Sequence, residues 1–294
     1  MGVGWLGEPI VRATGIDKDY SIRNHMRLHS LPTALGVIAA TSLAASIAGP
    51  VQPTGAELAP GSGLNLAPPY DGADVKGREF YFTRAIYSSY GRRSGSWSID
   101  FPKADVQFLV GVRRYTNIDA YEYEHPVRLD DPELRRYPFL YALEVGRMAL
   151  TPPEIEGLRS YLLAGGFLVI DDFWDIAEWQ NFEYEISQVL PEYPIVDIPL
   201  DHPLLSAFYE IGELVQVPNV DRAFRGGPTW ECYSPCQPAL RGIFDDHDRL
   251  MVVINWNTDL GDAWEWVEQP FYPFTYSSFA YKLGINMIIY GMSH

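Results

Sequence analysis

Residues 151–173, TPPEIEGLRSYLLAGGFLVIDDF, carry the signals of a helix, a turn and a buried strand in one continuous stretch. Thr151 followed three residues later by Glu154 is the capping-box pattern, and Pro152 stands at the first helical position, where its missing N–H costs nothing. Gly165-Gly166 is typical of a helix that ends in the left-handed conformation. The pattern therefore predicts a helix that runs from the capping box to this glycine pair.

The strand that follows indicates where in the predicted sheet a functional site would lie. Phe167 to Ile170 is uninterrupted apolar sequence, as expected of a central parallel strand that is covered on both faces. Asp171 and Asp172 come where that strand ends. In open α/β sheets ligands bind outside the carboxyl ends of the strands, so this edge is the predicted location of a functional site.

The rest of the globular region alternates strands with helices. Pro126 limits its strand to an edge or bulged position, and a polar turn over 245–248 joins two strands as a hairpin. Together these signals predict a mostly parallel sheet with helices on both sides, closed by a C-terminal hairpin plus helix. The predicted strands are 78–89, 119–129, 137–145, 167–170, 193–200, 237–245 and 249–257, and further helices are predicted over 104–118, 178–191, a short stretch after 201, and 277–292.

The charge balance excludes some partners. The chain has 38 acidic and 22 basic residues and a net charge of −16. Nucleic acids and anionic membranes both require Lys/Arg patches, so neither is an expected partner. The acidic surface does not select a cationic partner, because solubility explains it equally well.

The N-terminal region has the pattern of an export signal. Met26-Arg27 precedes a short apolar stretch rich in small residues, and small residues at 46–48 fit a cleavage site. A buried helix is the competing interpretation, which prolines at 32, 50 and 53 oppose. The predicted parts are an upstream extension (1–25), a signal peptide or N-terminal anchor (26–49), a disordered linker (50–76) and an α/β domain (77–294), in an exported protein of the periplasm or cell envelope.

The two cysteines, Cys232 and Cys236, are separated by three residues in a proline-rich loop. In an exported protein a local disulfide is the leading interpretation. Metal binding is weaker, because His247 is the only other nearby ligand candidate. A catalytic thiol is the weakest alternative, since neither cysteine stands on a strand-to-helix turn.

Several segments, taken in order, resemble a known family. They are SWSIDFPKAD, DDPELRRYPFLYALE, LTPPEIEGLRSYLLAGGFLVIDDF, IPLDHPLL, DDHDRLMVVINWNTDLGDAWEW and YKLGINMIIYGM. Over residues 78–292 the chain resembles the uncharacterised bacterial family called Domain of Unknown Function 4159. The resemblance implies a class I glutamine amidotransferase-like fold, which is a flavodoxin-like three-layer sandwich. It also implies envelope partners of the MoxR ATPase and von Willebrand A type, but no reaction.

The amidotransferase comparison also gives a negative expectation. Those enzymes carry a catalytic cysteine on a sharp turn between a strand and a helix. The corresponding strand end here reads VIDDFW and holds neither cysteine nor serine, so no glutaminase activity is expected. The chain also lacks the G-x-S-x-G and P-loop motifs, and the predicted α/β domain over 77–294 lacks a G-x-G-x-x-G motif.

The strand-end carboxylates are the strongest site candidates. Because side chains alternate along a strand, only one of Asp171 and Asp172 can point into a crevice. That carboxylate could bind a cation, act as a general base or hold a sugar hydroxyl; the competing interpretation is a pair of cap and loop residues. Glu144 would add a third carboxylate at the same edge.

A second strand end, Asp201-His202, is expected at the same edge. His202 beside Asp172 would form a carboxylate–imidazole pair suited to proton transfer or to part of a metal site. The competing interpretation is a helix cap by Asp201 with a structurally bonded His202.

Aromatic and acidic residues gather in the loop from Trp256 and Asn257 to Trp266. Indole rings beside carboxylates and amides can stack on sugars or hold a peptide. Equally, the loop can pack over the domain as a lid.

The hypothesis is an exported binding or scaffold module for a partner, a glycan or a small ligand. No cofactor is expected, and Asp172 and His202 are only weak metal candidates. The alternative is a metal-dependent or acid–base hydrolase. The candidate ligand-binding residues are Glu144, Asp171, Asp172, Trp174, Asp201, His202, Trp256 and Asn257.

Overall fold

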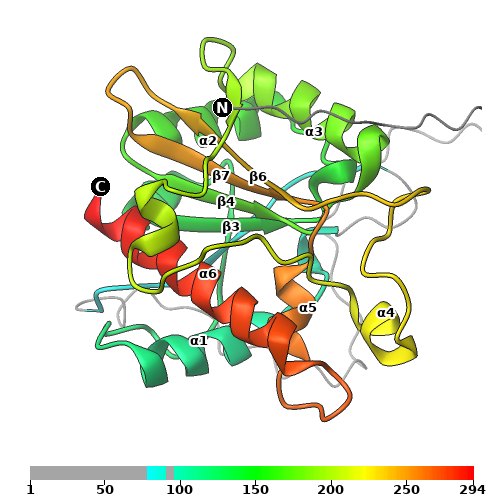
Figure 1. Ribbon diagram of the computed structural model, residues 1–294. Coiled ribbons are helices and arrows are strands. Elements are labelled where there is room, and N and C mark those ends of the chain that lie inside the picture. Colours follow the sequence, from blue (N-terminus) through cyan, green and yellow to red (C-terminus); the bar gives the residue numbers. More distant parts are fainter. Residues whose placement is uncertain (1–77, 91–95) are drawn as a thin grey trace, which may run out of the picture. The chain divides into compact units, whose positions relative to one another are not determined.

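A seven-stranded sheet forms the middle layer of a three-layer α/β sandwich in the computed structural model, which describes residues 78–90 and 96–294 (Figure 1). The predicted extension, signal peptide and linker lie outside the described residues. The strand order is β2-β1-β3-β4-β7-β6-β5. The strands are β1 (Thr83–Ile86), β2 (His125–Arg128), β3 (Phe139–Leu143), β4 (Phe167–Asp171), β5 (Ile195–Asp197), β6 (Ala239–Phe244) and β7 (Leu250–Trp256).

The sheet is mostly parallel, as the alternation of strands and helices predicts. Strands β2, β1, β3, β4 and β7 run in the same direction, and β6 is antiparallel to both of its neighbours, β7 and β5. Pro126 lies in β2, at the edge of the sheet, where its missing N–H is tolerated. The order 2-1-3-4-7 of the parallel strands is that of a flavodoxin-like sheet, whose order reverses between β1 and β3 and whose ligands bind beside that reversal.

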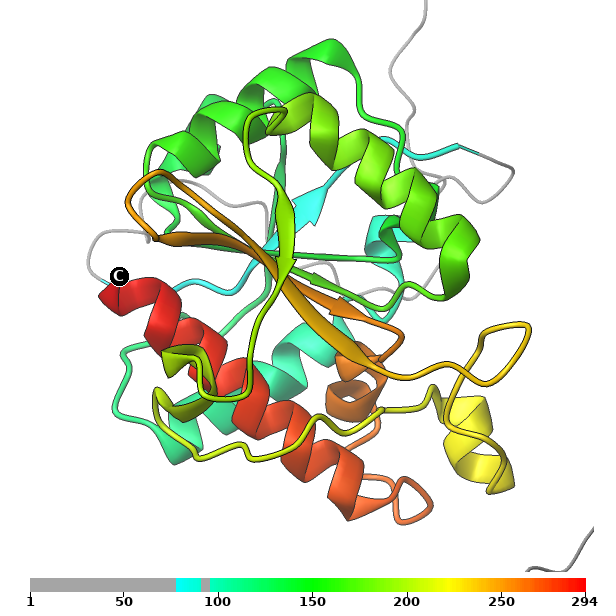
Figure 2. The same ribbon diagram turned by 45° about the horizontal axis from the view of Figure 1, so that its top comes forward.

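Helices cover both faces of the sheet (Figures 1 and 2). Helices α1 (Lys103–Tyr115), α5 (Leu260–Glu265) and α6 (Phe274–Ser293) pack on one face, and α2 (Pro152–Leu163) and α3 (Asp175–Val189) pack on the other. A short helix, α4 (Val220–Arg225), lies in the long connection between β5 and β6. The 3₁₀ turns are η1 (Ser96–Ser98), η2 (Pro132–Arg136), η3 (Val145–Arg147) and η4 (Pro203–Ser206).

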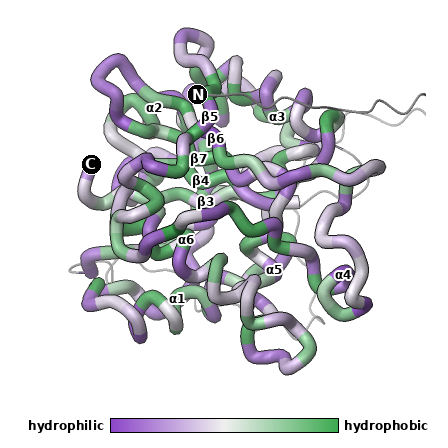
Figure 3. Tube along the Cα trace, viewed as in Figure 1, coloured by the Kyte–Doolittle hydropathy of each residue, from purple (hydrophilic) through white to green (hydrophobic). Residues whose placement is uncertain are grey.

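Two apolar cores follow from the alternation of side chains along the strands. Phe139, Tyr141 and Leu143 of β3 join the core under α1 and α6, whereas Leu140 and Ala142 join the core under α2 and α3. Figure 3 shows hydrophobic residues along the central strands and hydrophilic residues along the outer turns. The buried apolar run of β4 is therefore explained by helices on both of its faces.

Residues 151–173 fold as predicted. Thr151 N donates to Glu154 Oε2 at 2.8 Å, and both halves of the capping box are present. Gly165 ends the helix with a φ of 109°, a conformation that side chains rarely adopt. The predicted hairpin is also confirmed, since β6 and β7 pair as antiparallel neighbours.

Some predicted boundaries were wrong. The strand predicted over 193–200 is only three residues long, and the short helix predicted after 201 is the 3₁₀ turn η4. Among the described residues, no helix combines the length and the hydropathy that crossing a membrane would require.

Candidate functional site

Four acidic residues follow the ends of four parallel strands. Asp100 lies in the loop after β1, Glu144 follows β3, Asp172 follows β4, and Asp259 lies just after β7. The first three have φ between 48° and 60°, which is uncommon outside glycine and is best tolerated by Asn and Asp. The chain therefore turns sharply directly after β3 and β4, and again at Asp100 in the loop that follows β1.

Three of these carboxylates converge. Asp100, Asp172 and Asp259 each provide one oxygen, and the three oxygens lie within 4.8 Å of one another. The Asp172 side chain is 6% exposed and that of Asp259 is 2% exposed. We call these three residues the carboxylate triad. Three anionic groups this close, largely removed from water, require either protons or a cation to compensate their charge.

Hydrogen bonds fix the carboxylate triad in this arrangement. Trp174 Nε1 donates to Asp172 Oδ1 at 2.9 Å, and the backbone N–H of Asp262 donates to Asp259 Oδ1 at 2.7 Å. Among the described residues no donor reaches the other oxygen of either group, and the buried Asp100 Oδ2 likewise has no partner. One oriented oxygen and one unused oxygen on a carboxylate is the arrangement that outer hydrogen bonds give to metal ligands.

A buried arginine positions the loop that carries Asp100. Arg84 of β1 is fully buried and forms an ion pair with Asp105 of α1. Its Nη1 also donates to Trp97 O at 3.3 Å and to Ile99 O at 3.2 Å, immediately before Asp100. Because Asp105 already balances the charge of Arg84, the arginine only partly offsets the negative charge of the triad.

Asp171 has a structural role beneath the triad. Its Oδ2 accepts hydrogen bonds from Tyr141 Oη at 2.6 Å and from the backbone N–H groups of Leu260 and Gly261 at 3.0 and 3.1 Å. These bonds hold the first turn of α5 against the end of β4, and so they place Asp259 beside Asp172. Burial raises the pKa of Asp171 to about 7, although these hydrogen bonds favour its ionised form.

The carboxylates of the triad are difficult to ionise together. Burial raises the pKa of Asp172 well above its usual range, and the negative charges of Glu144 and Asp100 raise it further. Burial and the charge of Asp172 do the same to the pKa of Asp259. The pKa of Asp100 is also raised, first by burial and then by Asp262, while Arg84 acts in the opposite direction. Burial and mutual repulsion therefore favour the protonated forms of the three carboxyl groups when no cation compensates their charge.

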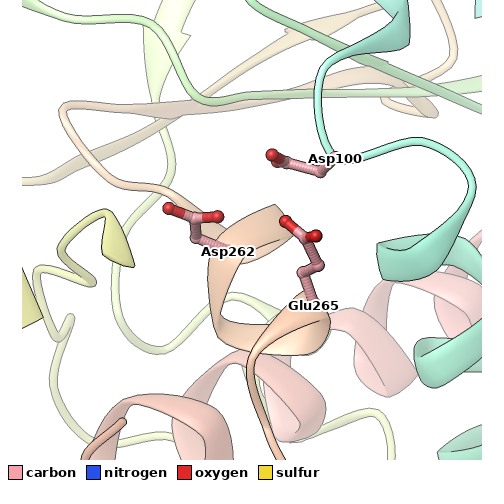
Figure 4. Close-up of side chains that lie close together, drawn as sticks. All are labelled: Asp100, Asp262 and Glu265. Carbon is pink, nitrogen blue, oxygen red and sulfur yellow. The ribbon is translucent and has the colours of Figure 1, made fainter. Parts of the chain in front are cut away.

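A second acidic group shares Asp100 but is already compensated. Asp262 and Glu265 extend from α5 toward Asp100 (Figure 4), and the three offer oxygens within 4.8 Å of one another. Lys103 Nζ lies 3.8 Å from Glu265 Oε1. Asp262 accepts hydrogen bonds on both oxygens, from Val220 N at 2.6 Å and from Trp266 Nε1 at 3.0 Å. The carboxylate triad is therefore the better cation site of the two.

The structure places most of the predicted site residues at this edge. Glu144 N donates to Asp172 O at 3.0 Å, so the two strand ends are adjacent as predicted. Trp174 contacts the site through its hydrogen bond to Asp172. Asn257 is at the edge too, but its amide is used by the chain: Oδ1 accepts from Asp175 N at 3.0 Å and Nδ2 donates to Gln237 O at 3.0 Å.

Trp256 is a packing residue in this structure. Its ring lies 4.8 Å from that of Trp179, and the Arg241 guanidinium lies 4.8 Å above it. Of the aromatic loop, Trp264 is buried and stacks on Phe108 at 4.2 Å, so this ring packs beneath the surface of the domain.

The expectation that His202 lies beside Asp172 is wrong. The ring of His202 contacts Phe244 and Tyr290, with centroids 5.7 and 5.6 Å apart, and Tyr290 packs on Phe167 at the start of β4. After β5 the chain turns back toward the amino edge of the sheet, taking Asp201 and His202 with it. His202 Nδ1 accepts from Leu204 N at 3.2 Å, so His202 rather than Asp201 caps the turn.

Two members of the triad were absent from the predicted site. The sequence contains a signal that could have identified Asp259, since this residue follows a predicted strand and precedes Asp262 at the spacing of a helix cap. Asp100 had no such signal, because it lies 14 positions after the last residue of β1 and its neighbours come from distant parts of the chain.

The cysteine loop lies next to the same edge. Cys232 and Cys236 form a disulfide, and Tyr233 N donates to Asp175 Oδ2 at 2.8 Å, at the start of α3. Glu231 in this loop adds its negative charge to the surroundings of Asp172. Both cysteines are used in the disulfide, which leaves no free thiol in the chain.

Comparison with known families places the chain in a family. The family described as Domain of unknown function (DUF4159) matches residues 82–292, and the chain belongs to it. No curated protein matches the chain.

Proposed function

We propose that this DUF4159 domain is a binding module that holds a hard divalent cation in the carboxylate triad of Asp100, Asp172 and Asp259. The proposal depends on one observation, namely that three carboxylate oxygens lie within 4.8 Å of one another at the end of the sheet. Mg²⁺, Mn²⁺ and Ca²⁺ prefer oxygen ligands, and carboxylates supply them with charge compensation.

A cation held in this way would recruit a further ligand. These ions take six or more oxygen ligands, so three monodentate carboxylates leave coordination positions open. Water, a phosphate, a carboxylate or sugar hydroxyls can fill those positions. The cation would thereby connect the acidic strand ends to an oxygen-rich ligand, including a phosphate or carboxylate that the net charge of −16 would otherwise repel.

Calorimetric titration of the purified full chain with Mg²⁺, Mn²⁺ and Ca²⁺ tests the proposal. We expect at least one of these ions to bind with one ion per chain. D172N and D259N should each weaken binding about tenfold or more, because each removes a charged ligand. The matched control is D246N, which removes an exposed carboxylate from the hairpin turn and should leave binding unchanged.

Two results would overturn the proposal. One is the absence of binding heat with all three ions at neutral pH. The other is unchanged affinity in D172N and D259N, with circular dichroism showing that both variants are folded.

A hydrolase is the second candidate, and the open coordination positions favour it. A divalent ion can activate a bound water for attack on an ester or phosphoester. An acid–base version that uses His202 has no support, since His202 lies at the other end of the sheet. Mn²⁺-dependent turnover of generic phosphoester or ester substrates, lost in D172N, would favour the hydrolase over the binding module.

Export to the periplasm or cell envelope also belongs to the proposal. The signal-like sequence of residues 26–49 supports it, and so does the disulfide between Cys232 and Cys236, because disulfides persist in oxidising compartments. Envelope proteins of the MoxR ATPase and von Willebrand A type are the proposed partners. Fractionation of cells that express a tagged chain would test the location.

The finer fold assignment is likewise a proposal: the domain is glutamine amidotransferase-like but has no glutaminase activity. The flavodoxin-like order of the parallel strands supports the first part. The second part is supported by Asp171 and Asp172 at the end of β4 and by the engagement of both cysteines in a disulfide. Release of ammonia from glutamine by the purified chain would contradict it.

A further inference from the structure

A groove of about 400 Å³ lies between α1 and α6, and the proposed cation site does not use it. Tyr281 of α6 closes its floor: the ring lies against Gly111 of α1, where an added Cβ would be 2.1 Å from Tyr281 Cε1. The Tyr281 hydroxyl also donates to Gln107 O at 2.8 Å. The two helices are therefore joined at this contact, and the groove is a built feature of their packing.

The groove is mostly apolar and its rim is exposed. Val110 and Tyr115 of α1 and Phe274 of α6 line it, and Phe274 is 81% exposed. The cavity volume and the apolar lining are those of small-molecule sites, which add a few polar groups that fix the orientation of the ligand.

A buried hydroxyl in the groove has no partner. Ser277 of α6 lines the groove and is only 3% exposed, and among the described residues nothing hydrogen-bonds its Oγ. A buried polar atom without a partner destabilises the folded state, so a hydrogen bond from a polar group of a ligand would be favourable at this position.

Two cationic side chains that line the groove have no ion-pair partner among the described residues. Arg114 and Lys282 line it, and neither forms an ion pair within the described part of the chain, although most arginines there do. Glu268 is the acidic residue on the same lining, which leaves the groove with a net charge of +1 in a chain whose net charge is −16. An anionic head group is therefore favoured locally even though the whole chain repels anions.

We infer that the groove binds a small amphipathic carboxylate, with its apolar body between α1 and α6. The head group would interact with Arg114 and Lys282, and a polar atom would reach Ser277 Oγ. The ligand class follows from the combination of apolar lining, buried hydroxyl and uncompensated cations.

The test uses the full chain and three probes: decanoate, decan-1-ol and acetate. We expect decanoate to bind more tightly than decan-1-ol and acetate not to bind, as measured by calorimetry. The R114A/K282A double variant should weaken decanoate binding about tenfold and leave decan-1-ol binding unchanged. R113A is the matched control, because Arg113 is the neighbouring exposed arginine and pairs with Glu122 at 3.5 Å.

The conservative S277A variant keeps the inference testable if the double variant is poorly folded. It removes only the Oγ and should weaken decanoate binding without lowering thermal stability. The inference is overturned if decanoate does not bind, or if the folded double variant binds decanoate as tightly as R113A does. Failure here is distinguishable from failure of the cation proposal, because Mg²⁺, Mn²⁺ or Ca²⁺ titrations of R114A/K282A should match those of the unmodified chain.

Discussion

At the scale of single residues, Arg84 connects the stability of the domain to its candidate site. Its guanidinium has no solvent exposure, pairs with Asp105 through Nη2 and through Nε at 3.0 Å, and lies 5.1 Å from the ring of Tyr141. The same side chain holds the loop before Asp100. A change in its partner should therefore disturb both the core and the carboxylate triad.

D105N tests this connection. It leaves the buried Arg84 without a counter-charge, and breaking a buried ion pair on one side costs about 3–5 kcal/mol. We expect a loss of this size in the free energy of unfolding measured by urea denaturation. D221N is the comparison, because Asp221 forms an exposed pair with Arg225 at 3.6 Å, and its loss should change stability by less than about 1 kcal/mol. Equal effects of the two substitutions would contradict the role assigned to Arg84.

At the scale of elements, α5 positions one side of the triad, and Gly261 in its first turn allows Asp100 to approach. A Cβ at Gly261 would lie 2.6 Å from Asp100 Oδ2 and 3.4 Å from Tyr141 Oη. Both the carboxylate and the helix would have to shift to accept a side chain.

G261A should therefore weaken cation binding while the domain stays folded. Alanine favours a helix over glycine by about 1 kcal/mol, which offsets part of the cost of the shift, so the domain should stay folded while Asp100 is displaced. We expect cation affinity to fall about tenfold, which is ~1.4 kcal/mol, in calorimetric titration. The control is G212A, because nothing lies within 4 Å of a Cβ at Gly212. Unchanged affinity in G261A would argue against Asp100 as a ligand.

The elements also show how far the sequence determines the site. Glu144 and Asp172 were predictable, because each directly follows a buried parallel strand and such ends meet at one edge. His202 was not, since β5 pairs with the antiparallel β6 and the chain after it turns back toward Phe244. The position of Asp100 depends on contacts between Arg84 and segments that are distant in the sequence, and no local sequence pattern predicts such contacts.

At the scale of the whole molecule, the buried carboxylates make stability depend on pH. The folded-state pKa values of Asp172, Asp259 and Asp100 are raised by burial and by their mutual repulsion, and that of Asp171 is about 7. In the unfolded chain aspartates titrate near ~4. Between these values the folded state binds more protons than the unfolded state, so stability falls as pH rises.

Thermal unfolding with and without cation should reveal this linkage. Without divalent ions we expect Tm to fall as pH rises from about 4.5 to about 8. Over this range the folded state binds more protons than the unfolded state, so a lower proton concentration favours unfolding. At about pH 8 a cation at 100 times its Kd should add about 2.7 kcal/mol, or roughly 5–10 °C in Tm for a domain of this size. At about pH 4.5 the same ion should have almost no effect, since protons already occupy the carboxylates. In D172N the same cation concentration should give about half the stabilisation or less, because binding is weakened about tenfold or more, whereas D246N should retain the full effect. A Tm that rises with pH in the absence of cations, or a cation effect of equal size at both pH values, would show that the triad does not exchange protons for a metal ion.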